Sequence, residues 1–475
     1  MRPSCKEDGI ERGGDAMKWL RRILCVLVML VVSNLVAVVC VLPLYRRTGE
    51  WQLPLAACLL VLLLILILMR PLGNVALPTR RIRQLAAGAE LLRLFLVTVT
   101  LDLVSALWFL MLLSPWTGAD GYEIGIGWLV WGGHVLLIVA VAAAVFWAGM
   151  IRVYLTSVQL GLKHRVLAAL CGWIPLLNIW YLLRIIRIVS DEVEFETEKW
   201  ELDEARAESE ICKTKYPLLL VHGVFFRDFR YLNYWGRIPR ELQRNGATVY
   251  YGQQQSAAAV EESGKELAAR IRQIVEETGC GKVNIIAHSK GGLDSRAAIA
   301  HQGMAPYVAS LTTINTPHRG CIFAEYLLNR MPQAARQKIA DTYNATLRRL
   351  GDPDPDFLAA VTDLTASACM ARNEETPDQP GVVYESVMSY CKRAQHGKFP
   401  LNMTHPIVEH FDGLNDGLVA VDSAKWGSRF TLVEPQGRRG ISHGDVVDLN
   451  RENIPGFDVR EFYVRLAADL KVRGF

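Results

Sequence analysis

Long apolar stretches fill the first part of the chain. Four stretches of about 17 to 25 residues carry almost no charge: 23–42, 53–69, 94–113 and 126–150. A helix rises about 1.5 Å per residue, so each stretch is long enough, or nearly so, to cross a hydrocarbon core of about 30 Å. None has the polar face of a helix in a soluble bundle. The pattern predicts a multi-span α-helical membrane domain over residues 1–189.

A fifth apolar stretch, residues 166–183, contains Gly172, Pro175 and Asn178 and has basic residues at both ends. It forms either a full crossing or a re-entrant or interfacial hairpin. Lys and Arg also concentrate before the first stretch and in the loop of residues 70–93, which places both in the cytoplasm. The basic flanks favour the hairpin, and with it a cytoplasmic position for the rest of the chain. A full crossing would place the rest outside.

One acidic side chain, Asp102, falls inside the third predicted span. Ionisable residues within a membrane are costly and usually have a function, so Asp102 is a candidate functional residue. The alternative is that the nearby hydroxyl groups of Thr98, Thr100 and Ser105 satisfy its hydrogen bonds.

Charge is distributed unevenly along the chain. Residues 1–189 contain 18 basic and 9 acidic side chains, whereas residues 190–475 contain 34 and 39. The acidic second part has no basic stripe interleaved with aromatic residues, so no nucleic-acid partner is expected. Residues 190–212 are polar and acidic and lack Pro and Gly. They are typical of a solvated helical linker.

From residue 213 the pattern changes to short β-rich runs that alternate with helical periodicity. Residues 216–222, 247–251 and 283–287 predict strands, and residues 257–278 predict an amphipathic helix between the second and third. This alternation predicts a mostly parallel sheet with helices on both faces, over residues 213–475. Between about 321 and 400, two amphipathic helical segments, 323–350 and 356–370, predict a helical cap insertion over the substrate site. The alternative is a helical decoration with no gating role.

The strongest chemical signal follows the strand at 283–287. Residues 287–292 read Ala-His-Ser-Lys-Gly-Gly and lead into a helical stretch. A nucleophile elbow needs small residues two positions before and after its serine, because the turn is tight. Ala287 and Gly291 meet this requirement around Ser289. The alternative is a serine that only caps the following helix.

A serine nucleophile needs a base and an orienting acid, and α/β-hydrolases supply them in the order Ser, Asp, His. His443 is favoured as the base because it lies after the acid candidates and near the last strand–helix unit. Two aspartates compete for the role of the acid, Asp412 and Asp416, because a turn aspartate explains either one structurally.

Residues 216–472 resemble the bacterial true-lipase group of α/β-hydrolases. The matching segments are Tyr-Pro-Leu-Leu-Leu-Val-His-Gly (216–223), Lys-Val-Asn-Ile-Ile-Ala-His-Ser-Lys-Gly-Gly (282–292), Asn-Thr-Pro-His-Arg-Gly (315–320), Asp-Leu-Thr (363–365), Asn-Asp-Gly-Leu-Val (415–419) and His-Gly-Asp (443–445). The resemblance implies the triad Ser289, Asp416 and His443. It also implies an oxyanion hole formed by the backbone N–H groups of Val224 and Lys290. The secreted lipases have no counterpart of the membrane domain, which would serve here as an anchor.

Two features of that group have no match here. The disulfide cysteine that often follows Asn-Asp-Gly is absent, and five cysteines of this part are expected to be free thiols: Cys212, Cys280, Cys321, Cys369 and Cys391. The resemblance also implies a structural calcium ion held by two aspartates near the histidine. Asp445 matches one of them, but no second aspartate was identified. We therefore expect no cofactor and no metal site.

The sequence predicts a membrane-anchored serine hydrolase that cleaves carboxylic esters of lipid-like substrates through an acyl-enzyme. Its expected partners are a lipid or other ester and the bilayer. The alternatives within the class are a thioesterase and a phospholipase, because the triad accepts different leaving groups. The alternative from another class is a non-catalytic membrane scaffold or transport-associated protein.

Overall fold

The computed structural model describes residues 7–41, 52–70, 77–113, 121–224, 233–349 and 351–475. The chain divides into two compact units, Met1–Glu201 and Leu202–Phe475. Each unit has its own hydrophobic clusters and is described by itself.

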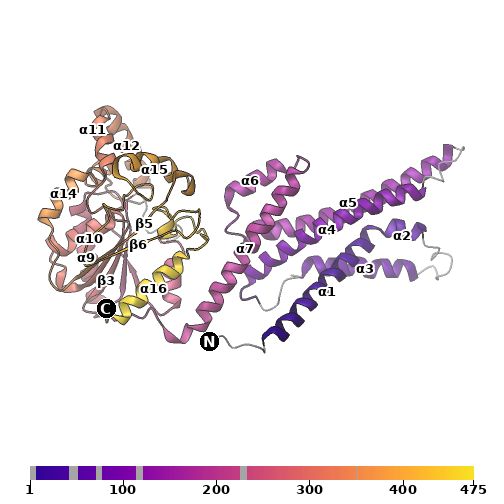
Figure 1. The fold of residues 1–475 in the computed structure, drawn as a ribbon, viewed down its shortest axis with the longest axis horizontal. Coiled ribbons are helices and arrows are strands. Elements are labelled where there is room, and N and C mark those ends of the chain that lie inside the picture. Colours follow the sequence, from indigo (N-terminus) through magenta and orange to yellow (C-terminus); the bar gives the residue numbers. More distant parts are fainter. Residues whose placement is uncertain (1–6, 42–51, 71–76, 114–120, 225–232, 350) are drawn as a thin grey trace. The chain divides into compact units, whose positions relative to one another are not determined.

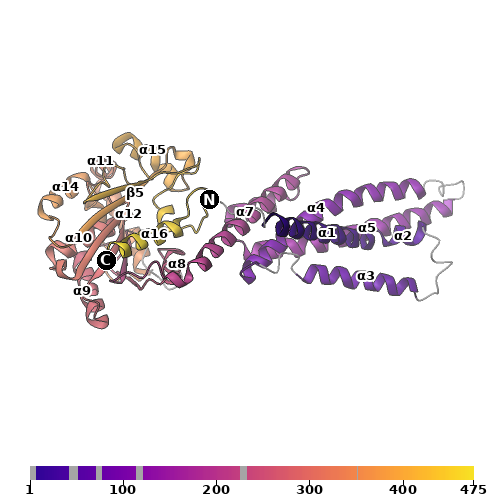
Figure 2. The same ribbon diagram turned by 60° about the horizontal axis from the view of Figure 1, so that its bottom comes forward.

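The first unit is helical. Its helices are α1 (Glu7–Ser33), α2 (Leu35–Val41), α3 (Gln52–Met69), α4 (Arg80–Leu113), α5 (Gly121–Thr156), α6 (Gly161–Cys171) and α7 (Leu177–Ala205), the last of which continues into the second unit. The helices α4 and α5 lie side by side (Figures 1 and 2). They approach closely at Gly88 and Gly149, since a Cβ atom on Gly88 would lie 3.0 Å from the carbonyl oxygen of Gly149.

Two helices of the described part of this unit are long and apolar enough to cross a membrane, Arg80–Leu112 and Gly127–Thr156. A shorter apolar helix covers Leu55–Met69. The first predicted span, 23–42, is divided at Asn34 between α1 and α2. The fifth stretch, 166–183, is divided between α6 and α7 by a turn in which Leu176 has φ +65°. A multi-span membrane arrangement therefore stays a prediction.

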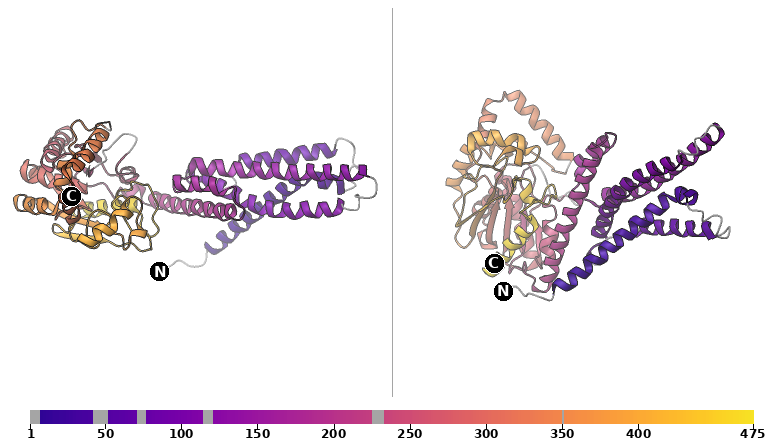
Figure 3. Two further views of the ribbon diagram at one scale, coloured as in Figure 1. Left: turned by 90° about the horizontal axis from the view of Figure 1, so that it is seen from above. Right: turned by 45° about the vertical axis from the view of Figure 1, so that its right-hand side comes forward.

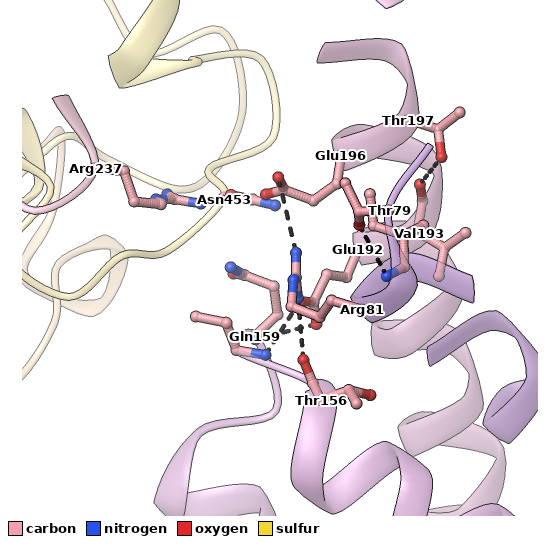
Figure 4. A network of polar contacts seen from close by, with 12 residues as sticks. Thr79, Arg81, Thr156, Gln159, Glu192, Val193, Glu196, Thr197, Arg237 and Asn453 are labelled. Carbon is pink, nitrogen blue, oxygen red and sulfur yellow. Dashed lines mark hydrogen bonds and ion pairs between the residues drawn. The ribbon is translucent and has the colours of Figure 1, made fainter. Parts of the chain in front are cut away.

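A buried carboxylate joins three helices of this unit. Glu192 of α7 accepts a hydrogen bond from Arg81 Nη1 of α4 at 2.6 Å (Figure 4). It accepts another from Ser157 Oγ, also at 2.6 Å. It also accepts the backbone N–H groups of Val158 and Gln159 in the turn after α5. Because its side chain has no exposed surface, these bonds replace the water that the charge would otherwise need. The interaction fixes the α5–α6 turn against α4 and α7.

The second unit contains a six-stranded parallel sheet in the order β2-β1-β3-β4-β5-β6. Its strands are β1 (Leu218–Val221), β2 (Val249–Tyr251), β3 (Val283–His288), β4 (Val308–Ile314), β5 (Val383–Ser389) and β6 (Arg429–Val433). The central strands β3 and β4 are buried along their whole length, as is typical of strands covered by helices on both faces of a parallel sheet. This is the sheet of an α/β-hydrolase fold.

Helices cover both faces of this sheet (Figure 1). On one face, α8 (Ile238–Arg244) and α16 (Val459–Val472) pack into a cluster around Trp235 and Tyr463. On the other face, α9 (Val260–Thr278) and α10 (Lys290–His301) pack around Leu267 and Ile271. Short 3-10 helices cover Ala207–Ser209, Ala305–Tyr307, Ala394–His396 and Asp445–Val447.

The helical insertion begins after β4. It contains α11 (Ile322–Arg330), α12 (Gln333–Arg349), α13 (Phe357–Thr362) and α14 (Ala366–Glu375), and α15 (Leu401–Asp412) follows β5. The predicted cap of residues 321–400 needs a correction, because residues 383–389 form β5 and pair with β4 and β6. Figures 1 and 3 show α11, α12 and α15 gathered at one end of the sheet.

Two aspartates of the insertion accept hydrogen bonds from residues at and just before the start of α9. Asp363 accepts the backbone N–H of Val260 at 2.6 Å, and Asp352 accepts the backbone N–H and the hydroxyl of Ser256. These bonds fix the base of the insertion beside the sheet, next to the candidate site.

Candidate active site

Ser289 lies at a sharp turn between β3 and α10. Its backbone has φ 55° and ψ −133°, a conformation that is uncommon for a residue with a side chain. Such strain persists only where the surrounding structure enforces it, and it clusters at functional sites. Small neighbours make room for the turn: a Cβ atom on Gly223 would lie only 2.7 Å from Cβ of Ser289, and one on Gly291 would collide with the His222 carbonyl. This geometry is that of a nucleophile elbow.

Asp416 and His443 are in direct contact. His443 Nδ1 lies 2.6 Å from Asp416 Oδ2, and the His443 backbone N–H donates to the Asp416 carbonyl at 3.0 Å. The Asp416 side chain has no exposed surface, and its Oδ1 accepts the backbone N–H groups of Leu418 and Val419. The buried carboxylate is thus held in one orientation toward the imidazole ring.

His288 connects this pair to the elbow. Its ring centroid lies 4.4 Å from that of His443, and it directly precedes Ser289 in the chain. Its Nδ1 lies 2.6 Å from the hydroxyl oxygen of Tyr234. Burial, and then the neighbouring His443, lower the pKa of His288 well below its usual range. His288 therefore stays neutral and places no positive charge beside His443.

The other candidate acid, Asp412, lies at the end of α15 and has a different task. Its carboxylate accepts the backbone N–H groups of Ile322 at 2.9 Å and Phe323 at 3.0 Å, the first two residues of α11. An acid in this position satisfies donors that the helix itself cannot. The structure therefore explains Asp412 as a helix cap and brings Asp416, not Asp412, to His443.

The two predicted oxyanion donors flank the elbow. Lys290 is the first residue of α10, so its backbone N–H has no acceptor within the helix. Val224 follows His222 and Gly223 after β1, and the His222 ring is held by a contact of 3.0 Å between its Nε2 and the Gln254 carbonyl oxygen. Residues 225–232, which continue this loop, lie outside the described residues.

The Lys290 side chain points into the protein and does not serve the oxyanion. Its Nζ lies 2.6 Å from Asp294 Oδ1 and 3.0 Å from Ser263 Oγ, and it is almost completely buried. Burial raises the pKa of Asp294 to about 6, although the nearby Lys290 ammonium opposes this rise. The ion pair anchors the first turn of α10 under the elbow.

Sequence reasoning missed Asn315, which contacts the predicted acid. Its side-chain amide donates to Asp416 Oδ2 at 2.5 Å and to Ser389 Oγ at 2.8 Å. It follows β4 and has φ 48°, which asparagine tolerates better than most residues. The only signal was its position in the Asn-Thr-Pro-His-Arg-Gly segment, which does not reveal the contact.

The first unit places Asp102 in a polar cluster. Asp102 Oδ1 accepts hydrogen bonds from Ser33 Oγ at 2.7 Å and Asn34 Nδ2 at 2.8 Å. The expected neighbours do not supply its partners. The hydroxyls of Thr98, Thr100 and Ser105 donate to carbonyl groups of their own helix, because a hydroxyl in a helix reaches the preceding turn easily.

The residues near the histidine do not fit a calcium site. Asp445 Oδ2 accepts the Ser442 hydroxyl at 2.6 Å and lies 2.9 Å from Arg439 Nη2. The Arg439 guanidinium already supplies the positive charge that a calcium ion would bring to Asp445. Among the described residues, no group of three or more His, Cys, Asp and Glu side chains could hold a metal ion. The five cysteines of the second unit are free thiols.

Comparisons with known proteins concern this second unit. Residues 236–349 match the family model "Putative serine esterase (DUF676)", a range that contains Ser289 and ends before Asp416. The chain is 36% identical over 178 residues to a triacylglycerol lipase of Pseudarthrobacter phenanthrenivorans, which is 34% of this chain and 54% of the relative. It is also 36% identical over 178 residues to a triacylglycerol lipase of Burkholderia plantarii, covering 34% and 49%.

Among solved structures, the lipase of Staphylococcus hyicus is 19% identical, with a TM-score of 0.42. The match covers 55% of this chain and 96% of that chain. The chain spans about half the length of the first two curated relatives it matches. The match to the serine-esterase family model thus includes Ser289, and the matches to the triacylglycerol lipases cover about a third of this chain.

Proposed function

We propose that the chain is a serine hydrolase that cleaves carboxylic esters of lipid-like substrates through an acyl-enzyme. The single observation that carries the proposal is the buried Asp416–His443 pair, packed through His288 against the strained Ser289 elbow. A turn serine that only capped a helix would need none of these partners.

In this mechanism Ser289 Oγ attacks the ester carbonyl while His443 Nε2 removes its proton. Asp416 keeps Nδ1 protonated and stabilises the imidazolium that forms. The backbone N–H groups of Val224 and Lys290 bind the oxyanion; one such donor is typically worth roughly 100- to 1000-fold in rate. His443 then protonates the leaving alcohol, and water repeats the cycle on the acyl-enzyme. The reaction requires no metal or organic cofactor.

The lipid-like substrate rests on two observations. The curated relatives carry the name triacylglycerol lipase. Large apolar side chains are also exposed on the helices at the sheet end that carries the insertion: Ile322, Tyr326 and Leu327 of α11, and Met403 and Ile407 of α15. A soluble protein usually covers such a surface unless it contacts an apolar ligand or a lipid surface.

Membrane anchoring by the first unit is also part of the proposal. The two long apolar helices α4 and α5 expose large hydrophobic side chains, among them Leu103 at 63% and Leu129 at 77%. Side chains of this kind are stable in lipid and costly in water. A lipid-anchored hydrolase would have its substrate in the same phase as its anchor.

The test is covalent labelling of the purified full chain in detergent with a fluorophosphonate, combined with hydrolysis of esters of graded acyl length. We expect labelling and hydrolysis of the wild type and neither for Ser289→Ala, whose fold should be intact. A non-catalytic scaffold would give an unlabelled wild type. A thioester series run beside the esters decides which leaving group the site prefers.

A further inference from the structure

Arg439 bonds to four oxygen atoms around the loop that carries His443. Its Nη1 donates to the carbonyl oxygens of His396 at 2.9 Å and Gly440 at 2.8 Å. Its Nη2 lies 2.9 Å from Asp445 Oδ2 and 3.2 Å from Glu452 Oε2. The Arg439 side chain thereby links Gly440, which precedes His443, to Asp445 and Glu452, which follow it. It also links this loop to His396 in the segment after β5.

The carboxylate of Asp445 transmits this interaction to the histidine. Its Oδ2 accepts the backbone N–H and the hydroxyl of Ser442, the residue directly before His443. The backbone N–H of His443 donates to the Asp416 carbonyl. The position of the imidazole therefore depends on a short turn, 442–445, whose charged centre is Asp445.

A buried carboxylate in this position needs a positive partner. Asp445 is 4% exposed, and an isolated charge at that depth would be expensive. Arg439 supplies the charge, and Lys398 Nζ neutralises Glu452 from the other side at 2.6 Å. Two carboxylates and two carbonyl oxygens around one positive centre are also the ligands that Ca²⁺ prefers. The four oxygen atoms thus form a site of the kind that binds a cation, and the Arg439 guanidinium supplies the positive charge in it.

We propose that Arg439 is a positioning residue for the reaction, which holds the His443 turn as a built-in cation and makes a bound metal ion unnecessary there. The proposal rests on the proposed ester hydrolysis and adds to it a role for a residue outside the triad. Arg439 acts on the reaction through Asp445 and Ser442, which are not reacting residues themselves but hold the turn of His443.

The experiment compares Arg439→Ala with Arg438→Ala in the full chain, using the ester assay with and without Ca²⁺. Arg438 is the neighbouring exposed arginine, so its variant controls for the loss of one charge from this loop. We expect kcat of Arg439→Ala to fall roughly 10- to 100-fold with KM unchanged, since a small misplacement of a catalytic group costs this much. Arg438→Ala should match the wild type.

Calcium should rescue the variant and leave the wild type unaffected. Arg439→Ala removes the positive partner of Asp445, leaves Glu452 with Lys398 alone and frees two carbonyl groups, so Ca²⁺ at about 1–10 mM should restore most of kcat. Mg²⁺ should restore less, because it demands stricter octahedral geometry. The double variant Arg439→Ala/Asp445→Asn should show no rescue. EDTA should not reduce wild-type activity.

Three results would overturn the proposal: wild-type kcat in Arg439→Ala, a loss of kcat that Ca²⁺ does not reverse in a variant that still folds, or inactivation of the wild type by EDTA. Arg439→Lys, which keeps the charge but not the fork of donors, gives an intermediate kcat if the proposal holds. Should the alanine variant fail to fold, this milder variant carries the same comparison.

Hydrogen exchange separates this proposal from the proposed function. Amides of residues 440–449 should exchange faster in Arg439→Ala than in the wild type, and Ca²⁺ should slow them again. This readout needs no substrate. A wild type without esterase activity would contradict the proposed function, whereas unchanged exchange in Arg439→Ala would contradict only the positioning role.

Discussion

Asn315 donates its side-chain amide to Asp416 Oδ2 at 2.5 Å, and the same oxygen lies 2.6 Å from His443 Nδ1. The amide is itself fixed, because its Oδ1 accepts the Ser389 backbone N–H at 3.0 Å. A residue at the end of β4 thus orients the carboxylate that we propose as the acid, Asp416, which follows α15. The acid is buried, so each donor that it loses has no water to replace it.

The first prediction tests this contact with Asn315→Gly. Glycine suits the φ of 48° at this position, so the variant removes the amide without straining the backbone. We expect kcat to fall about 10- to 100-fold with KM unchanged, as for other residues that orient a functional side chain. Steady-state kinetics on a soluble ester measures the effect. Wild-type kcat in a folded Asn315→Gly variant would show that Asp416 needs no such support.

The second prediction ranks the two aspartates. Asp416→Asn should lower kcat by about 10⁴, because an amide favours the wrong tautomer of His443. Asp412→Asn should leave kcat near the wild-type value and lower stability by about 1 kcal/mol, since an asparagine oxygen caps α11 less well than a carboxylate. Kinetics and thermal unfolding of both variants decide the ranking. A larger kinetic loss for Asp412→Asn would assign the acid to that residue.

Local sequence patterns were enough to predict the first three strands of the second unit and the turn at Ser289. The predicted strands 216–222, 247–251 and 283–287 coincide with β1, β2 and β3 to within two residues at each end. They are short, strongly apolar and bounded by turns, and the elbow follows directly from the small residues around Ser289. These features depend on neighbours in sequence, so a single chain reveals them.

Features that depend on distant partners could not be predicted in this way. The strand β5 was included in the cap, and its pairing with β4 and β6, strands far from it in sequence, is what identifies it. The contacts of Asn315 and Arg439 join segments up to 101 residues apart. Asp412 and Asp416 look alike in sequence and differ only in what they contact.

The third prediction concerns the dependence of stability on pH. Burial, followed by the charges of Arg296 and Arg319, lowers the pKa of His318 well below its usual range. The folded chain therefore keeps His318 neutral, while the unfolded chain takes up a proton below about pH 6.5. Because the unfolded state binds more protons there, the free energy of unfolding falls as pH falls, by about 1.4 kcal/mol per pH unit for one such group.

His318→Phe should reduce the slope of the free energy of unfolding against pH by the contribution of about one proton, roughly 1.4 kcal/mol per pH unit. Phenylalanine keeps an aromatic ring against Trp426, whose ring centroid lies 5.2 Å from that of His318. Urea unfolding of the full chain in detergent, followed by tryptophan fluorescence between about pH 7.5 and pH 5, measures both slopes. His288 is buried in the same way and keeps its own contribution in both proteins. Parallel slopes for the two proteins would mean that His318 is protonated in the folded state.

The fourth prediction concerns the side of the membrane on which the second unit would lie if the first unit is the proposed anchor. The basic flanks of residues 166–183 favour a cytoplasmic position. Cys280, in the loop between α9 and β3, is half-buried and can react, whereas Cys391 is 1% exposed and burial raises the pKa of its thiol to about 12. Cys391 is therefore unsuitable as a probe, because the thiolate is the reactive form.

In intact cells, a membrane-impermeant maleimide should leave Cys280 unlabelled, and permeabilisation should expose it. The signal is the difference between the wild type and Cys280→Ser, which removes the contribution of Cys40 and Cys58, the thiols exposed on the apolar helices. A known cytoplasmic thiol in the same cells reports whether the reagent has leaked. Labelling of Cys280 without permeabilisation, while that control stays protected, would place the hydrolase unit outside. The four other predicted spans are an even number of crossings and return the chain to the side of its basic N-terminus. An outside position would therefore require the stretch 166–183 to cross the membrane as well, although α6 and α7 divide it.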